Sequence, residues 1–319
     1  MKTFTKRVFI SFAILFAFQC IVADDSAPIT SDKAMLEYVV ANATVCPVRE
    51  NPSEAAEQAT QLLFGEVCEV IERLSSWTKI RSIVDGQVGW VSSSMLTRTD
   101  SPVSVPRYPQ TDSRAVVTAP MAAATPLSGG ADLLLTLGTR LPNYSHGTFE
   151  VLGQQYSIDS TCVSLPISHS EASNSSHGER PIGGTPSDHH RVVAIAKSLL
   201  NTPYLWGGKN MMGLDCSGFT QVVYAAMGIN ILRNAREQIT QGELVPSLAD
   251  AQPGDLAFFN HADRDPKATK ITHVGLLLSP TEIIHCAGGR VHIDAIDEQG
   301  ILLSSGKRTH HLAAIKRYL

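Results

Sequence analysis

The chain has 319 residues, of which 43% are hydrophobic, and a formal net charge of -4 at pH 7. That length provides for two or three small domains with cores of their own. The weakly acidic balance argues against nucleic acid and against an anionic membrane surface as binding partners, because both attract basic proteins.

The amino-terminal stretch, residues 1–23, has the pattern of a signal peptide. Basic residues are followed by an apolar run over residues 8–18, and Ala23 is a suitable cleavage position. The apolar run is too short to cross a bilayer comfortably, so we expect no stable membrane span and a secreted or periplasmic protein. Lipid anchoring at Cys20 is a minor alternative, because the residues before it are bulkier than a lipoprotein signal usually tolerates.

Residues 31–98 are rich in short strand patterns. Apolar and acidic residues alternate over residues 65–72, Trp77 opens a second strand, and an Asp-Gly turn signal precedes the segment around Trp90. Strands of this length with such turns predict a small antiparallel barrel, and the segment resembles a bacterial SH3 domain. The two tryptophans are predicted to lie in its core, with a glycan or peptide platform as the alternative.

A similar rhythm follows in residues 112–167, after a proline-rich break. Four strands are predicted there, over residues 116–120, 132–137, 148–152 and 155–158. We interpret this segment as a second, divergent SH3-like barrel, although it lacks the Gly-Trp-Val closure of the first. Residues 168–187 carry Ser, Gly and Pro with almost no apolar spacing, which predicts a flexible linker.

Export also affects how the cysteines are interpreted. Leaving out Cys20, the chain has Cys46, Cys68, Cys162, Cys216 and Cys286. An odd number of cysteines in an oxidising compartment fits one reserved free thiol, which we assign to Cys216. Cys46 and Cys68 could form a disulfide within the first barrel or remain two buried thiols, and the sequence leaves both possibilities open.

The strongest chemical signal surrounds Cys216. Apolar residues recur at helical spacing from residue 219 onward, so a helix is predicted to begin near Asp215 and to end at Gly228. Cys216 is therefore expected at a helix N-terminus, where unpaired N–H groups and the macrodipole favour thiolate over thiol. The alternative for a lone cysteine is a small hydrophobic residue in a buried helix.

Two histidines downstream are candidates for the base that a thiol nucleophile needs. Two predicted strands form a hairpin, in which Ser279 would face Thr281 and Gly275 would face His285. His273 and His285 would then be diagonal neighbours on one face, roughly 7–8 Å apart at the backbone. A cysteine at a helix start, one histidine as proton acceptor and a second that holds the first ring form a nucleophile, base and orienter arrangement.

Several sequence motifs occur in the order that is typical of one family. They are YLWGG at residues 204–208, GLDCSGF at 213–219, PGDLAFF at 253–259, HVG at 273–275 and the later His285. With these motifs, residues 188–319 resemble the NlpC/P60 family of cell-wall cysteine peptidases. The resemblance implies that Cys216 is the nucleophile, His273 the general base and His285 the orienting residue.

The resemblance also implies which residues surround the thiol. Asp215 and Ser217 would lie near the amino end of a bound peptide. Tyr204 would stand beside the thiol and help to stabilise the oxyanion, and Trp206 would contribute to substrate binding. No metal or other cofactor is implied.

The implied fold of the C-terminal domain is α+β and papain-like, with helices first and a mainly antiparallel sheet afterwards. The domain is predicted to open with a helix capped by Ser187 or Asp188, whose apolar stripe should pack on the sheet. The strands of the sheet are predicted over residues 255–259, 273–278, 282–286, 291–295 and 312–318.

Two features bear on substrate contacts. Relatives carry Arg, then Ser or Thr, then Gln where this chain has Arg233, Ala235 and Gln238, so one substrate hydrogen bond of the family pattern is in doubt. The charged loop at residues 261–270 ends just before His273. We expect this loop to be solvated surface. The alternative is that it borders the cleft and contacts a charged stem peptide.

The predicted function is that of an exported, monomeric cysteine endopeptidase acting on peptidoglycan stem peptides or muropeptides through a thioester intermediate. The family implies cleavage between D-glutamate and the following diamino acid. In relatives of this layout a barrel closes one end of the cleft and selects stems with a free N-terminal L-alanine. Asp215 would pair with that amine, with help from an acidic residue of the first barrel.

Three alternatives use the same residues differently. A zinc site of Cys216, His273 and His285 is possible in principle, but the usual Cys-x-x-Cys or His-Glu-x-x-His spacing is absent. A catalytically silent wall-binding module would use the barrels and keep the peptidase fold as a scaffold. An acyltransferase or amidase would apply the same three groups to another substrate.

Overall fold

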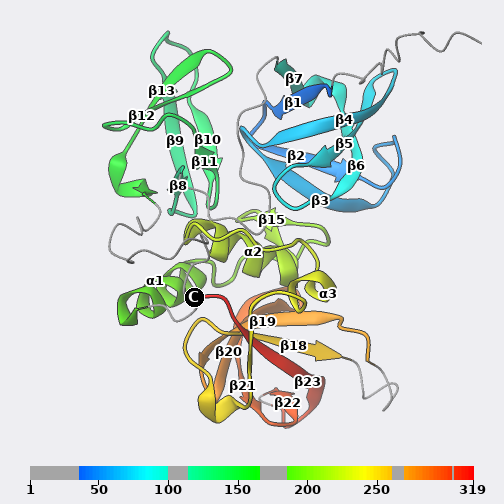
Figure 1. Cartoon of the computed structure of the whole chain (residues 1–319), viewed down its shortest axis with the longest axis vertical. Helices are drawn as coiled ribbons and strands as arrows, with labels where there is room; N and C mark the ends of the chain where they lie inside the picture. Colours follow the sequence, from blue (N-terminus) through cyan, green and yellow to red (C-terminus); the bar gives the residue numbers. More distant parts are fainter. Residues whose placement is uncertain (1–35, 100–113, 166–184, 261–268, 304) are drawn as a thin grey trace, which may run out of the picture. The chain divides into compact units, whose positions relative to one another are not determined.

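The computed structural model describes residues 36–99, 114–165, 185–260, 269–303 and 305–319, and Leu36–Leu319 form one compact unit. Figure 1 follows the chain from the first strands in blue to the C-terminal strand in red. The predicted signal peptide, most of the predicted linker and most of the charged loop at 261–270 lie outside the described residues. Within the described ranges, no helix combines the length and the apolar character that crossing a membrane requires.

The first β unit is an antiparallel sheet of seven strands in the order β3-β2-β6-β5-β4-β1-β7. The strands are β1 (Tyr38–Ala41), β2 (Val45–Arg49), β3 (Gln58–Leu63), β4 (Val67–Leu74), β5 (Trp77–Ser82), β6 (Val88–Ser92) and β7 (Leu96–Thr99). The predicted turn between β5 and β6 contains Gly86 at a φ of 74°, a conformation that glycine adopts without strain. Trp90 is buried, as predicted, and Trp77 is half-buried.

The five cysteines of the described residues are all free thiols. Cys46 and Cys68 are fully buried in the core of the first β unit, and burial raises the pKa of Cys46 to about 11. The possible disulfide between them is not formed. Cys216 is a free thiol, as predicted, but the other four cysteines are free as well, so the odd number does not single it out.

Residues 115–164 form a second β unit of two antiparallel sheets, ordered β10-β9-β13-β12 and β11-β8-β14, around a shared core. The strands are β8 (Ala115–Val117), β9 (Met121–Pro126), β10 (Leu133–Thr136), β11 (Arg140–Leu141), β12 (Thr148–Val151), β13 (Gln154–Ile158) and β14 (Val163–Ser164). Strand β9 was not predicted, because its alanines have weak strand propensity. Pairing with β10 and β13 nevertheless makes it a central strand.

The C-terminal domain combines α1 (Pro186–Ser198), α2 (Cys216–Ala226) and the short α3 (Ala235–Gln238) with an antiparallel sheet ordered β17-β23-β18-β19-β20-β21-β22. The strands are β17 (Glu243–Val245), β18 (Leu256–Asn260), β19 (His273–Ser279), β20 (Glu282–Ala287), β21 (Arg290–Asp297), β22 (Gly300–Leu302) and β23 (Arg308–Arg317). Helix α2 packs on β19 and β20 and also contacts α1 (Figure 1). Phe219, Val222 and Val223 of α2 share one core with Phe258 and Val274, as the apolar spacing predicted. The prediction of an amphipathic helix was incomplete, because polar residues outside that stripe, such as Thr220 and Gln221, are buried as well.

The cap of α1 lies earlier than predicted. Thr185, and not Ser187 or Asp188, is the N-cap: its hydroxyl accepts from the N–H of Asp188, whose carboxylate accepts from the N–H of Thr185. Pro186 takes the first helical position, where its missing N–H costs nothing. The prediction was wrong because it did not use the proline as the start signal.

The β19–β20 hairpin determines which side of the sheet the two histidines occupy. The predicted pairing of Ser279 with Thr281 was wrong. Ser279 pairs with Glu282, because the register shifts next to the turn. Beyond that irregularity the predicted register holds, with Leu276 opposite Ile284. A methyl group on Gly275 would lie 2.8 Å from the Cβ of His285, which shows how closely these two positions approach.

Candidate active site

The nucleophile candidate is the first residue of α2. Asp215 is the N-cap of this helix, and its Oδ1 accepts a hydrogen bond of 2.6 Å from the N–H of Gly218. The half-buried Cys216 packs against the core between α2 and the sheet. The backbone N–H of Val274, the residue after His273, donates toward the sulfur. The thiol therefore lies at the junction of α2 and β19.

The acidity of this thiol differs from the sequence-based expectation. Burial, followed by the negative charge of Asp215, raises the pKa of Cys216 to about 12, although the N–H of Val274 and the charge of Arg233 act in the opposite direction. The N-cap carboxylate already occupies the helix end that would otherwise stabilise a thiolate. The thiol of Cys216 thus needs a base that takes its proton.

Two buried histidines and an aspartate continue the site into the sheet. Nε2 of His273 is 2.8 Å from Nδ1 of His285, and the side chains are 4% and 1% exposed. Nε2 of His285 is in turn 3.1 Å from Oδ2 of Asp294, and Nε2 of His292 lies 3.1 Å from the same oxygen. Both buried histidines were predicted from the sequence, but Asp294 was not. Its spacing of two from His292 on a strand was the signal, because such residues share one face.

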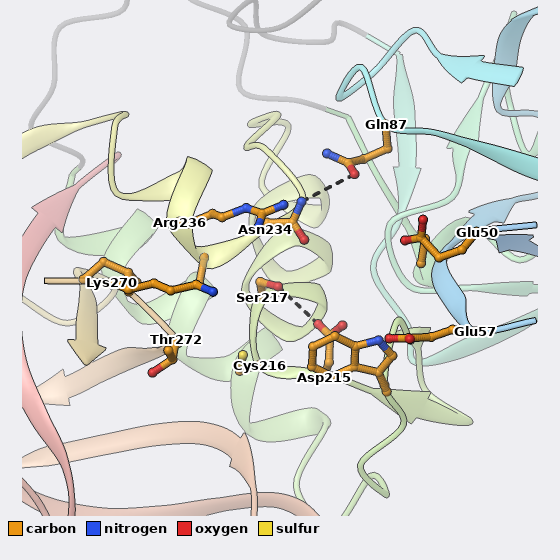
Figure 2. Close-up of a pocket in the computed structure, with 14 residues that line it drawn as sticks. Glu50, Glu57, Gln87, Asp215, Cys216, Ser217, Asn234, Arg236, Lys270 and Thr272 are labelled. Carbon is orange, nitrogen blue, oxygen red and sulfur yellow. Dashed lines mark hydrogen bonds between the residues drawn. The ribbon is translucent and has the colours of Figure 1, made fainter. Parts of the chain in front are cut away.

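The thiol faces a pocket of about 540 Å³ that is lined by residues of the first β unit and of the C-terminal domain. Among the lining residues are Glu50, Glu57, Gln87, Trp206, Asp215, Cys216, Ser217, Asn234, Ala235, Arg236, Lys270 and Thr272. Figure 2 shows Glu50 and Glu57 on one side of Cys216 and Arg236 and Lys270 on the other. The pocket therefore has an acidic end and a basic end.

Arg233 connects the start of α2 to the first β unit. Its side chain is 1% exposed, and its guanidinium donates to both carboxylate oxygens of Asp215, at 2.9 and 2.6 Å. It also donates to Oγ of Ser217 at 3.0 Å and to Oγ1 of Thr60 at 2.7 Å. Because Asp215 additionally accepts from the N–H of Gly207, its carboxylate is engaged by several donors of this chain. That arrangement speaks against Asp215 as the main partner of a substrate amine.

Tyr204 and Trp206 precede the helix and occupy different places. Tyr204 is 36% exposed, and burial, followed by the charge of Cys216, raises its pKa well above the usual value. Trp206 is 60% exposed and lines the pocket, and its carbonyl accepts a hydrogen bond of 3.0 Å from Gln58 of the first β unit. Between them and the helix, Gly207 has a φ of 71°, and a methyl group there would lie 2.6 Å from the carbonyl oxygen of Gln58.

Two groups of side chains contain possible metal ligands. Ligand atoms of His285, His292 and Asp294 lie within 4.8 Å of one another, but the hydrogen bonds among them already account for this cluster. For the zinc site considered from the sequence, His285 directs one nitrogen at His273 and the other at Asp294. Neither nitrogen of His285 is therefore available to an ion shared with Cys216.

Comparison with known proteins identifies the family. The model of the NlpC/P60 family matches residues 201–304, and that of the bacterial dipeptidyl-peptidase Sh3 domain matches residues 48–96. Over 238 residues the chain is 30% identical to a gamma-D-glutamyl-L-lysine dipeptidyl-peptidase of Bacillus subtilis (strain 168), with 71% of each chain covered. The chain belongs to the NlpC/P60 family. It is thus a member of a family of cysteine peptidases, as the motifs predicted.

Further NlpC/P60 proteins resemble this chain over most of its length. A gamma-D-glutamyl-L-lysine dipeptidyl-peptidase of Bacillus cereus (strain ATCC 10987 / NRS 248) is 26% identical over 283 residues, which cover 84% of this chain and 77% of that protein. The crystal structure of an NlpC/P60 family protein from Bacillus cereus ATCC 10987 aligns with a TM-score of 0.69 at 21% identity, covering 88% and 99% of the two chains. This likeness shows that the fold is shared.

Proposed function

We propose that this NlpC/P60 peptidase is exported and hydrolyses peptidoglycan stem peptides between γ-D-glutamate and the following diamino acid. The observation that carries the proposal is the pocket, in which Cys216 lies between an acidic end from the first β unit and a basic end. The relatives from Bacillus subtilis and Bacillus cereus, which are gamma-D-glutamyl-L-lysine dipeptidyl-peptidases, support the same bond.

In the proposed mechanism, His273 takes the proton of the Cys216 thiol as the sulfur attacks the γ-carbonyl carbon of D-glutamate. The carbon–nitrogen bond then breaks, and His273 returns the proton to the leaving amine, which leaves a thioester on Cys216. A water molecule gives a proton to His273 and attacks the thioester, so that the glutamate carboxyl and the thiol are regenerated. The raised pKa of Cys216 fits this sequence, because proton removal is coupled to attack. Tyr204, whose pKa is raised in part by the charge of Cys216, is the proposed donor to the oxyanion.

The two ends of the pocket suggest how the peptide lies. Glu50 and Glu57 are exposed carboxylates of the first β unit, and we assign to them the free amine of an N-terminal L-alanine. Arg236 and Lys270 face the remainder of the stem, which carries carboxylates. This assignment gives the amine to the first β unit, because Asp215 is already paired with Arg233.

The test is mass spectrometry of products from the tetrapeptide L-Ala-γ-D-Glu-L-Lys-D-Ala. The dipeptide L-Ala-γ-D-Glu is the expected product, and Cys216→Ala is expected to produce none. N-acetylation of the substrate should lower kcat/KM by at least about tenfold, the loss of one charge-assisted hydrogen bond. Glu57→Gln should lower kcat/KM for the free amine and leave the low value for the acetylated peptide unchanged. Efficient release of peptides from intact sacculi would overturn the requirement for a free amine.

Export and domain organisation are part of the same proposal. Cleavage after Ala23 would yield the mature enzyme, which we take to be a monomer, and mass spectrometry of the protein's N-terminus in culture supernatant or periplasm tests this. We also propose that the second β unit is a divergent relative of the first. The support is the repeated pattern of short antiparallel strands.

A further inference from the structure

Asp294 ends a hydrogen-bonded series that begins at His273, the residue before Val274, whose backbone N–H donates toward Cys216. The register of β20 and β21 places His292 opposite His285, so Asp294, two residues further along β21, is a diagonal neighbour of His285 on the same face. Its Oδ2 is 3.1 Å from Nε2 of His285, whose other nitrogen is 2.8 Å from Nε2 of His273. Because His285 is 1% exposed, solvent has little access to these contacts.

The chemistry of each group determines the direction of these hydrogen bonds. A hydrogen bond to His285 lowers the pKa of Asp294, so its carboxylate is ionised near neutral pH and can only accept. Nε2 of His285 must then carry the proton of that contact. Burial lowers the pKa of His285, which keeps the ring neutral and leaves Nδ1 as an acceptor. His273 consequently donates from Nε2, and its Nδ1 carries the lone pair.

A lone pair on Nδ1 is what the proposed base requires. A neutral histidine has one donor and one acceptor nitrogen, and which is which depends on the partner at the other end of the ring. If His285 carried its proton on Nδ1, His273 would have to accept at Nε2 and would present an N–H at Nδ1. His273 in that tautomer could not accept a proton at Nδ1. The direction of the hydrogen bonds from His273 to Asp294 therefore matters for activity.

His292 contacts the same carboxylate oxygen but lies outside this series. Its Nε2 is 3.1 Å from Oδ2 of Asp294, and its Nδ1 is 2.9 Å from the carbonyl oxygen of Arg290. The ring is partly exposed and packs against His285, with the two ring centroids 4.6 Å apart. His292 therefore offers a matched control, because its replacement alters the surroundings of Asp294 and leaves the three-member series intact.

We propose that Asp294 is a positioning residue that acts through His285 and fixes His273 in the tautomer with its proton on Nε2. The proposal rests on the proposed function, since it gives His273 its lone pair toward the thiol. Asp294 is not among the residues that line the pocket of Cys216, so its replacement should change kcat far more than KM.

The first experiment compares Asp294→Asn and His292→Gln in the full chain with the tetrapeptide substrate. Asn keeps nearly the same shape but can present either an N–H or an oxygen to His285, so the direction is no longer fixed. We expect kcat of Asp294→Asn to fall by about ten- to a hundredfold, a part of what a general base contributes, with KM within about twofold. The His292→Gln enzyme should keep kcat within about threefold, and Asp294→Glu should recover part of the lost kcat. A kcat of Asp294→Asn within about twofold of the parent would overturn the proposal.

The second experiment observes the tautomers directly, by long-range proton–nitrogen correlation NMR of the histidines in the inactive Cys216→Ala protein. His273 and His285 are both expected as the Nε2–H tautomer, and Asp294→Asn should introduce Nδ1–H tautomers of both. Nδ1–H tautomers in the parent protein would refute the proposal. This readout needs no turnover, so it remains decisive even if the enzyme fails to cleave stem peptides, which would reject the proposed function.

Discussion

Arg233→Met removes a buried charge that holds the start of α2 against the first β unit. The side chains of Arg233 and Asp215 are 1% and 10% exposed. Methionine keeps the approximate length of arginine and removes all donors, so the substitution leaves the carboxylate of Asp215 without its cation. The expected result is a large loss of stability of the Leu36–Leu319 unit.

The magnitude follows from the contacts that are lost and kept. Breaking a buried ion pair by removal of one partner costs about 3–5 kcal/mol. Asp215 would keep the backbone N–H groups of Gly207 and Gly218, at 3.0 and 2.6 Å, which compensate part of its charge. We therefore expect the lower part of that range, about 3 kcal/mol.

The assay is urea unfolding followed by far-ultraviolet circular dichroism, with the free energy of unfolding extrapolated to water. Arg308→Met is the matched control, because the Arg308–Asp297 pair lies on the surface and its loss should change stability little. The double variant Asp215→Asn with Arg233→Met should recover stability relative to Arg233→Met, since Asn still caps α2 and no charge is left unpaired. A loss below about 1 kcal/mol for Arg233→Met would refute the idea that Arg233 holds the start of α2 against the first β unit.

Four further predictions follow from the structure. Gly207→Ala should lower the free energy of unfolding by about 1–3 kcal/mol or more, because the φ of Gly207 is positive and the new methyl group would meet a carbonyl oxygen. Gly86 also has a positive φ, but a methyl group there would lie in open space, so Gly86→Ala should lower it less in the same urea assay. Burial lowers the pKa of His285 below its usual 6.5. The contribution of His285 to stability is therefore complete above pH 6.5 and is lost as the pH falls through the lower pKa of the folded protein. With His285→Gln, the urea midpoint should fall less between pH 7 and pH 5. Iodoacetamide should modify Cys216, which lines the pocket, and should leave the buried Cys46, which is 0% exposed, unmodified until the protein unfolds. Peptide mapping that finds Cys46 labelled before Cys216 would contradict this prediction. Prolonged treatment with EDTA should leave hydrolysis of the tetrapeptide unchanged, and a loss of activity that zinc restores would contradict thiol catalysis.

The sequence alone determined the local frame of the site. Helical spacing after Cys216 predicted α2 within two residues of its observed end and placed the thiol at the helix start. Strand alternation placed His273 and His285 on one face, and the error at Ser279 did no harm because the register shift is confined to the turn. Such features are encoded by spacing along a continuous segment, so they can be read without knowledge of the rest of the chain.

Only the tertiary structure decided which groups surround that frame. Arg233 meets Thr60 across 173 residues of sequence, and Glu50 and Glu57 reach the pocket of Cys216 from the first β unit. Asp294 becomes the partner of His285 only through the pairing of β20 with β21. The protonation of the thiol also depends on these partners, since Asp215 offsets the helix N-terminus that the sequence suggested would favour a thiolate. The physical reason is that periodicity specifies which face of an element is buried, whereas the partner of a buried charge is whatever remote segment folding brings within hydrogen-bond distance.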